Sequence, residues 1–182
     1  MFETKRLIIR QWRESDFVPF SEINADPQVM RFFPSTLTTE ETMAQAQRVH
    51  AYIEKRGWGF WAVEEKATGQ FIGFVGLHHQ DEDCGIPNAP LVEIGWRLSS
   101  KYWGQGFAPE AARAALAFAF NTLALPAVYA FTALPNIPSK RVMEKIGMAN
   151  TGNDFDHPKL PKDHALARHC LYKITKEEFE AQ

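Results

Sequence analysis

The sequence has 182 residues, of which 45% are hydrophobic and 23% charged. This is the composition of a globular chain and excludes a disordered segment or a fibre. Its 20 Lys and Arg residues nearly balance 22 Asp and Glu residues, giving a formal net charge of -2. That balance argues against a dedicated nucleic-acid binder, which carries a basic excess to meet phosphates.

The cysteines and the N-terminus bear on the compartment. Cys84 and Cys170 lie far apart and in no Cys-x-x-Cys spacing, so we expect neither a disulfide framework nor a zinc site. Residues 1–6 lack the apolar stretch of a secretory signal. No segment approaches the roughly 20 apolar residues of a membrane-spanning helix. We expect a cytoplasmic protein with no metal, no membrane association and no direct nucleic-acid binding.

The N-terminal third predicts a short strand followed by helices. Residues 4–12 carry an apolar centre between polar ends, as a short strand does. Ser15-Asp16 and Asp26-Pro27 are helix start signals. Thr38–Glu41 forms a capping box for a helix that Gly57 closes. The buried stripe of that helix is expected to hold six residues: Met43, Ala46, Val49, Ala51, Tyr52 and Ile53.

From Gly59 on, the hydrophobic period changes from helical to extended. Strands are predicted over five ranges: 59–65, 71–78, 91–98, 128–133 and 169–174. Helices are predicted over 108–123, over 137–146 and from Thr175 to the C-terminus. Because helices interrupt the strands only in places, we expect an α/β chain of the α+β type with a mixed sheet. No repeat or linker is present, so one domain is expected over residues 1–182.

The segment from Tyr102 to Glu110 carries the most chemical information. Two glycines, Gly104 and Gly106, let the backbone turn sharply at a predicted helix start and bring several amide N–H groups to one point. Together with the helix dipole, such amides form a phosphate site. The alternative is an ordinary strand-to-helix turn, which the glycines alone would favour. The run departs from Gly-x-Gly-x-x-Gly, because Pro109 replaces the third glycine, and it lacks the P-loop ending.

Three segments together resemble the GNAT superfamily of acetyl-CoA-dependent N-acetyltransferases. Trp103–Ala108 is similar to motif A, which holds the pyrophosphate of coenzyme A. Asn136–Met148 is similar to the family's Asn-x-x-Ser…Glu-Lys-x-Gly-Phe segment, and Val92–Leu98 precedes the loop as the family pattern requires. The opening Thr4–Arg10 resembles the RimJ/RimL-type branch, which acetylates protein N-termini. The resemblance runs from about residue 4 to about residue 174.

The resemblance implies a fold, a reaction and a cofactor. The fold is a mixed, mostly antiparallel sheet flanked by helices and splayed between the strands on either side of the cofactor. The reaction is direct transfer of acetyl from acetyl-CoA to a primary amine, on a protein N-terminus or a small molecule, by a monomer or a homodimer. The implied cofactor-binding residues lie in three segments: Trp96, Arg97 and Leu98; Trp103, Gly104, Gln105, Gly106, Phe107 and Ala108; Asn136 and Ser139.

The catalytic residues implied are Ser139 and Glu93. The Ser139 hydroxyl could hydrogen-bond the departing sulfur, but a serine there also suits a helix cap or first turn. Glu93 is the first candidate for the general base, directly or through a water, and its alternative is a solvent-facing charge on an alternating strand. Asn136 could bind amides of the cofactor arm or simply make a turn. Gly95 could ease close approach of the cofactor or pack under a neighbour.

Two further features concern proton transfer and substrate choice. His78 and His79 end a predicted strand and point to opposite faces, so at most one could act as a base directly. The acidic run Asp81–Asp83 and a second loop around Asp154–His157 could attract a cationic amine, and simple solvation explains both equally well. These loops are where we expect substrate selectivity to lie.

One departure from the family keeps a second function open. Met143 stands where many members have the tyrosine that assists departure of the thiolate, and a thioether cannot donate a proton. The alternative to an enzyme is therefore a non-catalytic acyl-CoA-binding sensor or regulatory module. A third reading takes the 13% aromatic content as a stacking surface for single-stranded nucleic acid. Core packing explains these aromatics better, because most lie in predicted strands and amphipathic helices.

Overall fold

The computed structural model describes residues 1–182, which divide into two compact units. The first unit comprises Met1–Leu77 and Gly95–Ala115, and the second His78–Ile94 and Leu116–Gln182. Three elements contribute residues to both units: strand β4 (Gln70–Gln80), strand β5 (Leu91–Leu98) and helix α4 (Phe107–Asn121).

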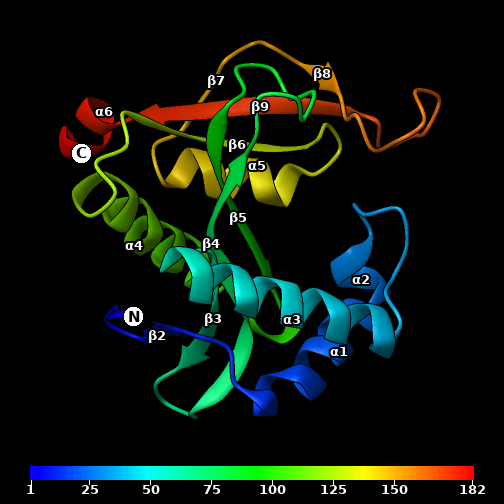
Figure 1. Ribbon diagram of the computed structural model, residues 1–182, viewed down its shortest axis with the longest axis vertical. Coiled ribbons are helices and arrows are strands. Elements are labelled where there is room, and N and C mark those ends of the chain that lie inside the picture. The colour runs from blue at the N-terminus through cyan, green and yellow to red at the C-terminus, as the bar shows by residue number, and fades with distance from the viewer. The chain divides into compact units, whose positions relative to one another are not determined.

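The first unit is built on a meander of strands (Figure 1). The order is β1 (Phe2–Glu3), β2 (Leu7–Arg10), β3 (Phe60–Glu65), β4 and β5, and the pairs β1/β2, β2/β3 and β3/β4 are antiparallel. The strands approach each other closely at Gly76, where a β-carbon would collide with the carbonyl oxygen of Gly59. Only glycine therefore fits at that position of β4.

The helices of the first unit begin where the sequence predicts. A short 3-10 helix η1 (Glu14–Asp16) leads into α1 (Phe17–Ala25), and α2 (Pro27–Met30) follows with Pro27 in its first turn. Helix α3 (Thr39–Arg56) has the predicted capping box at Thr38, and Gly57 ends it in the left-handed conformation. These caps satisfy backbone groups that a helix end leaves unpaired.

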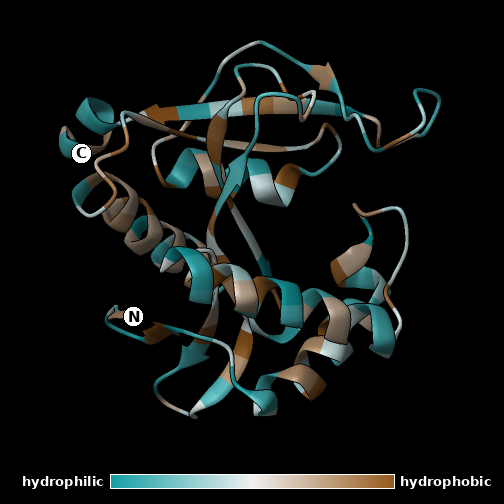
Figure 2. Cartoon of the chain, in the orientation of Figure 1, coloured by the Kyte–Doolittle hydropathy of each residue, from teal (hydrophilic) through white to brown (hydrophobic).

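The predicted buried stripe of α3 is wrong in part. The fully buried residues are Thr42, Ala46 and Ile53, whereas Met43 and Ala51 are exposed. At 100° per residue, Ala51 lies about 140° around the helix from Ala46, so the two cannot share a face. Figure 2 shows the mainly hydrophilic colouring of α3, in contrast to the largely apolar α4.

Aromatic rings and one ion-pair network fill the interior of the first unit. Trp12 packs against Phe20 and Phe74, and its indole N–H donates to the carbonyl of Phe60 at 2.8 Å. Arg10 is 2% exposed and donates to Asp16 at 2.7 and 2.9 Å and to Glu64 at 2.7 Å. These contacts fasten the chain after β2 to the sheet.

The second unit carries the remaining strands. The order is β5, β6 (Ala127–Ala133), β9 (Arg168–Thr175) and β7 (Ala149–Asn150), and β8 (Phe155–Asp156) also pairs with β9. β5 and β6 are parallel with one paired position, Glu93 with Tyr129, whereas β9 is antiparallel to β6, β7 and β8. The sheet is thus mixed and mostly antiparallel, as predicted. The splay on either side of the cofactor stays a prediction.

Two helices complete the second unit. Helix α5 (Ile137–Lys145) follows β6, and α6 (Lys176–Glu180) follows β9 with the predicted capping box at Thr175. The sequence did not predict the two-residue strands β1, β7 and β8, which are too short to show a period. None of the helices combines the length and hydrophobicity needed to span a bilayer.

Candidate active site

The loop before α4 has the conformation that the sequence predicts for a phosphate-binding turn. The 3-10 helix η2 (Ser100–Tyr102) leads into it, and Gly104 and Gly106 adopt φ angles of 74° and 81°. This left-handed region favours glycine. Trp103 anchors the loop through its indole N–H, which donates to the Leu98 carbonyl at 3.0 Å.

The backbone N–H groups of residues 104–108 form the chemical core of this loop. None of these N–H groups donates a hydrogen bond. The first backbone hydrogen bond of α4 runs from the Glu110 N–H to the Gly106 carbonyl oxygen at 3.2 Å. A β-carbon at Gly104 would meet no atom within 4 Å, so the loop is open there. Free amides at the positive end of a 15-residue helix suit a diphosphate.

The N-terminal segment holds this loop in place, which the sequence did not predict. Glu110 accepts hydrogen bonds from the Thr4 hydroxyl at 2.6 Å and from the Arg6 backbone N–H and Nε at 2.9 and 2.7 Å. Arg6 also donates to the Gln105 carbonyl at 2.9 Å and lies over the Phe107 ring at 4.3 Å. We call the Thr4, Arg6 and Glu110 contacts the N-terminal clasp.

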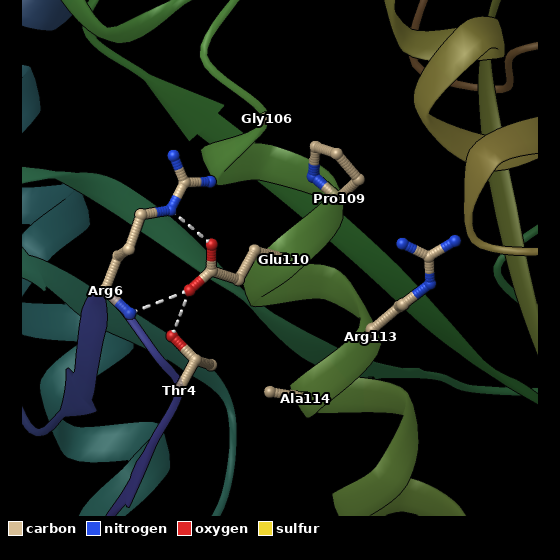
Figure 3. A pocket seen from close by; sticks show the side chains of 7 residues that line it. All are labelled: Thr4, Arg6, Gly106, Pro109, Glu110, Arg113 and Ala114. Carbon is tan, nitrogen blue, oxygen red and sulfur yellow. Dashed lines mark hydrogen bonds and ion pairs between the residues drawn. The ribbon is translucent and has the colours of Figure 1, made fainter.

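A cavity of about 630 Å³ lies beside this clasp (Figure 3). Seven residues line it: Thr4, Arg6, Gly106, Pro109, Glu110, Arg113 and Ala114. Burial acts to raise the pKa of Glu110, but the hydrogen bonds from Thr4 and Arg6 and the Arg6 charge outweigh it, so this pKa is lowered. Glu110 is therefore ionised at neutral pH and holds the clasp closed.

The end of β5 precedes the loop and belongs to the same unit. Trp96 is partly buried, and Leu98 is buried with its carbonyl taken by Trp103. Gly95 lies under Phe60, whose Cε1 would be 3.1 Å from a β-carbon there. The packing alternative for Gly95 is thus sufficient to explain a glycine. The side chain of Arg97 is buried and donates to Asn24 Oδ1 at 2.6 Å.

Glu93 belongs to the second unit and is largely buried, with 15% of its side chain exposed. The solvent-facing alternative is therefore wrong. Its pKa is raised to about 7 because burial penalises the carboxylate, and the Gln80 hydrogen bond and the Lys159 charge offset only part of this. His78 Nδ1 lies 3.9 Å from Glu93 Oε1, whereas His79 Nε2 lies 3.4 Å from Asp81. A carboxyl group with this pKa can accept a proton near neutral pH.

The start of α5 decides between the two structural alternatives that the sequence left open for Ser139, a helix cap or a first-turn position. Asn136 is the N-cap: its Oδ1 accepts from the Ser139 N–H at 3.3 Å, and its Nδ2 donates to Thr132 Oγ1 at 2.8 Å. The Ser139 side chain is partly exposed and its hydroxyl makes no hydrogen bond. Ser139 is thus not the capping residue, but it lies in the first turn of α5, as the first-turn form of that alternative predicts. Met143 is buried, so the thioether at the tyrosine position belongs to the core.

Two loops predicted to govern selectivity meet in the second unit. Gly85 lies against Pro158, and Ile86 packs with Phe155 in one hydrophobic cluster. The acidic residues 81–83 are exposed. The ring of His157, in the second loop, lies 4.8 Å from the ring of His169. The pKa of His157 is lowered to about 4 by burial, by His169 and by Lys159, so this imidazole is neutral at pH 7.

The predicted residues therefore fall into two groups. The first unit brings together the loop residues 103–108, the β5 end 96–98 and the N-terminal clasp. Glu93, Asn136 and Ser139 belong to the second unit. No group of three or more His, Cys, Asp or Glu side chains has an arrangement that could hold a metal ion.

Comparison with known proteins identifies the family. Residues 6–149 match the family model described as acetyltransferase (GNAT) domain. The chain is 31% identical over 184 residues to the uncharacterised N-acetyltransferase YnaD of Bacillus subtilis, covering 97% of each. It is 29% identical over 167 residues to the FsC-acetyl coenzyme A-N(2)-transacetylase of Aspergillus fumigatus, covering 87% of this chain and 68% of that protein.

A solved structure agrees with these sequence matches. The GNAT-family acetyltransferase from Bacillus anthracis superposes with a TM-score of 0.80 at 28% identity, covering 96% of this chain and 98% of that chain. This chain belongs to the GNAT family of acetyltransferases. It is an N-acetyltransferase with the mixed α/β fold of that family.

Proposed function

We propose that this protein transfers the acetyl group of acetyl-CoA directly to a primary amine. The observation that carries the proposal is the set of free amide N–H groups at residues 104–108, at the start of α4. Gly104 and Gly106 leave room for the backbone to approach a diphosphate. Other proposed cofactor contacts come from Trp103, Gln105, Phe107 and Ala108 of the loop, from Trp96, Arg97 and Leu98 through their backbone, and from Asn136 and Ser139.

Two side chains are proposed to carry the chemistry. Acetyl-CoA, when bound, supplies an acetyl thioester. Glu93 accepts the proton of the acceptor ammonium, directly or through a water, because its raised pKa leaves it about half ionised at pH 7. Ser139 has an unpaired hydroxyl that can donate a hydrogen bond to a developing thiolate. Backbone N–H groups of β5 are proposed to stabilise the oxyanion.

The acceptor is proposed to be a protein N-terminus or a small-molecule amine. The opening Thr4–Arg10 favours the RimJ/RimL-like branch, and the similarity to a fungal acetyl coenzyme A-N(2)-transacetylase favours transfer from acetyl-CoA to a nitrogen. We further propose that residues 1–182 form a single N-acetyltransferase domain. Its two free cysteines suit the reducing cytoplasm, and it works as a monomer or a homodimer.

An acceptor screen tests the function. Purified protein is incubated with acetyl-CoA and N-terminal peptides, polyamines or aminoglycosides, and release of the CoA thiol is followed. Turnover with at least one amine, accompanied by its mono-acetylated product, is expected. Calorimetry with acetyl-CoA alone separates binding from catalysis.

The sensor alternative rests on Met143, which cannot donate a proton. Met143 is buried in the core. If the enzyme protonates the departing thiolate, a residue other than Met143 must supply the proton. Tight binding of acetyl-CoA without turnover across the whole panel would favour the sensor. Slow thiol release without any amine would be hydrolysis and would favour neither reading.

A further inference from the structure

Arg97 is a buried cation without a carboxylate partner. It is 8% exposed and lies on β5 directly before the phosphate-binding loop. Its only hydrogen bonds run from Nη1 to neutral side-chain oxygens, Asn24 Oδ1 at 2.6 Å and Gln45 Oε1 at 3.5 Å. Its Nε is buried and has no partner. Burial lowers the pKa of Arg97 to about 10, and no opposing charge compensates.

Arg10 shows how the same unit treats an arginine that is purely structural. It is 2% exposed, and it pairs with Asp16 and Glu64 at 2.7 Å each. A buried charge normally requires such a partner, because desolvation is otherwise uncompensated. Arg97 is also buried, but its hydrogen-bond partners are only side-chain amides. The guanidinium of Arg97 therefore lacks an anionic partner within the protein, as an arginine that binds an anionic ligand does.

The unused edge of the guanidinium defines what it can bind. Nη1 is taken, whereas neither Nε nor Nη2 makes a hydrogen bond. These two nitrogens present parallel N–H groups that match the two oxygens of one carboxylate. Asn24 and Gln45 hold the group in position, so a carboxylate would meet an oriented donor pair.

Phe33 covers the guanidinium. Its ring centroid lies 4.3 Å from Arg97 Cζ, and the residue is 41% exposed in the irregular segment between α2 and α3. The same segment lies at the phosphate-binding loop, because Arg31 stacks over Trp103 at 5.0 Å. The Phe74 ring, 5.4 Å from Cζ, belongs to the core. Phe33 is thus the ring over Arg97 that can move aside with little loss of packing.

We propose that Arg97 binds a carboxylate on the acceptor substrate, so that the preferred acceptors are amino acids or other amines bearing an acidic group. The inference rests on the proposed acetyl transfer. The loop amides at residues 104–108 already serve the cofactor phosphates, which leaves Arg97 for a different anion. Phe33 moves from the guanidinium when the carboxylate enters.

Paired acceptors test this specificity. Thiol release is measured with α- and ω-amino acids and with the carboxamides of the same amines. We expect kcat/KM to be at least tenfold higher for the carboxylates. Arg97→Gln should bring that ratio close to one, whereas Arg48→Gln, an exposed arginine of α3, should leave it unchanged. Equal ratios in the wild type, or a preference that survives Arg97→Gln, would overturn the proposal.

A binding measurement keeps the proposal independent of turnover. The Arg97 Nε–H signal, identified in nitrogen-15 spectra by its loss in Arg97→Lys, should shift when acetate is added to the protein. Phe33→Ala should lower the acetate concentration at half-shift several-fold. An Nε–H signal that does not respond to acetate in either protein would refute the carboxylate site. Absence of turnover with every amine, with acetate still binding, would instead refute the acetyl transfer.

Discussion

Glu93 is the side chain whose environment fits its proposed task most directly. Its carboxyl group is largely buried beside His78 and Gln80, and its pKa of about 7 reflects that burial. A carboxyl group at its ordinary pKa would be a poor proton acceptor at neutral pH. Burial on β5 therefore gives this residue a basicity that its sequence alone does not reveal.

The pH dependence of the reaction should report Glu93. Since the ionised form is the base, kcat/KM should rise about tenfold per pH unit below pH 7 and level off above it. Glu93→Gln should lower kcat about 100-fold and remove this step, leaving only the ionisation of the amine itself. Initial rates of thiol release between about pH 5.5 and 9 measure both effects. An unchanged profile in Glu93→Gln would exclude this residue as the base.

Ser139 should affect the chemical step alone. Because its hydroxyl has no partner within the protein, Ser139→Ala leaves no protein group unsatisfied and should not alter folding. We expect kcat to fall about tenfold and the Kd for acetyl-CoA to stay within about twofold. Ser21→Ala, at a serine of α1 that bonds only to Thr39, is the matched control. Equal kcat values for Ser139→Ala and wild type would leave Ser139 without a catalytic role.

At the scale of elements, the proposed phosphate-binding loop depends on its glycines. Gly106→Val places a β-branched residue at φ 81°, so the loop amides should lose their common direction. We expect acetyl-CoA binding to weaken at least tenfold by calorimetry. Gly69→Val is the control, because Gly69 has φ 68° with open space around it in the turn between β3 and β4. A folded Gly106→Val variant with normal affinity would contradict the assigned loop.

The N-terminal clasp should position the same loop from the segment between β1 and β2. Arg6→Ala and Glu110→Ala should each raise the KM for acetyl-CoA several-fold with little change in kcat, because neither side chain is assigned to the reaction. The double variant should show a coupling free energy of about 1 kcal/mol, as expected for a partly exposed pair. Additive effects on KM would mean that the two residues act separately.

Local signals in the sequence predicted most elements but only part of the site. The capping boxes at Thr38 and Thr175 and the glycine at position 57 mark helix ends through contacts within a few residues, so a sequence window contains them. The clasp joins Arg6 to Glu110 across 104 positions. The side-chain amides that contact Arg97 likewise come from α1 and α3, which are far from β5 in the sequence, so the residues around Arg97 in the sequence do not reveal them.

At the scale of the whole molecule, the unfolding transition tests the single domain. Because β4, β5 and α4 each contribute residues to both compact units, we expect circular dichroism and tryptophan fluorescence to give coincident urea transitions. Two separate transitions would instead indicate two domains.

The pKa of Glu93 should also make the stability of the folded protein depend on pH. Because this pKa is raised, the folded state holds the proton more tightly than the unfolded state, so the free energy of unfolding should fall as pH rises from about 4.5 to about 7. Glu93→Gln should reduce that slope.

Trp103 provides a label-free view of the loop to which it belongs. Its indole is hydrogen-bonded to the Leu98 carbonyl, lies beneath the Arg31 guanidinium and is 36% exposed, whereas Trp12 and Trp61 are buried. Indole emission responds to polarity and to neighbouring charge. Binding of an anionic ligand at this loop should therefore change the emission of Trp103, so the proposed cofactor site carries its own spectroscopic reporter.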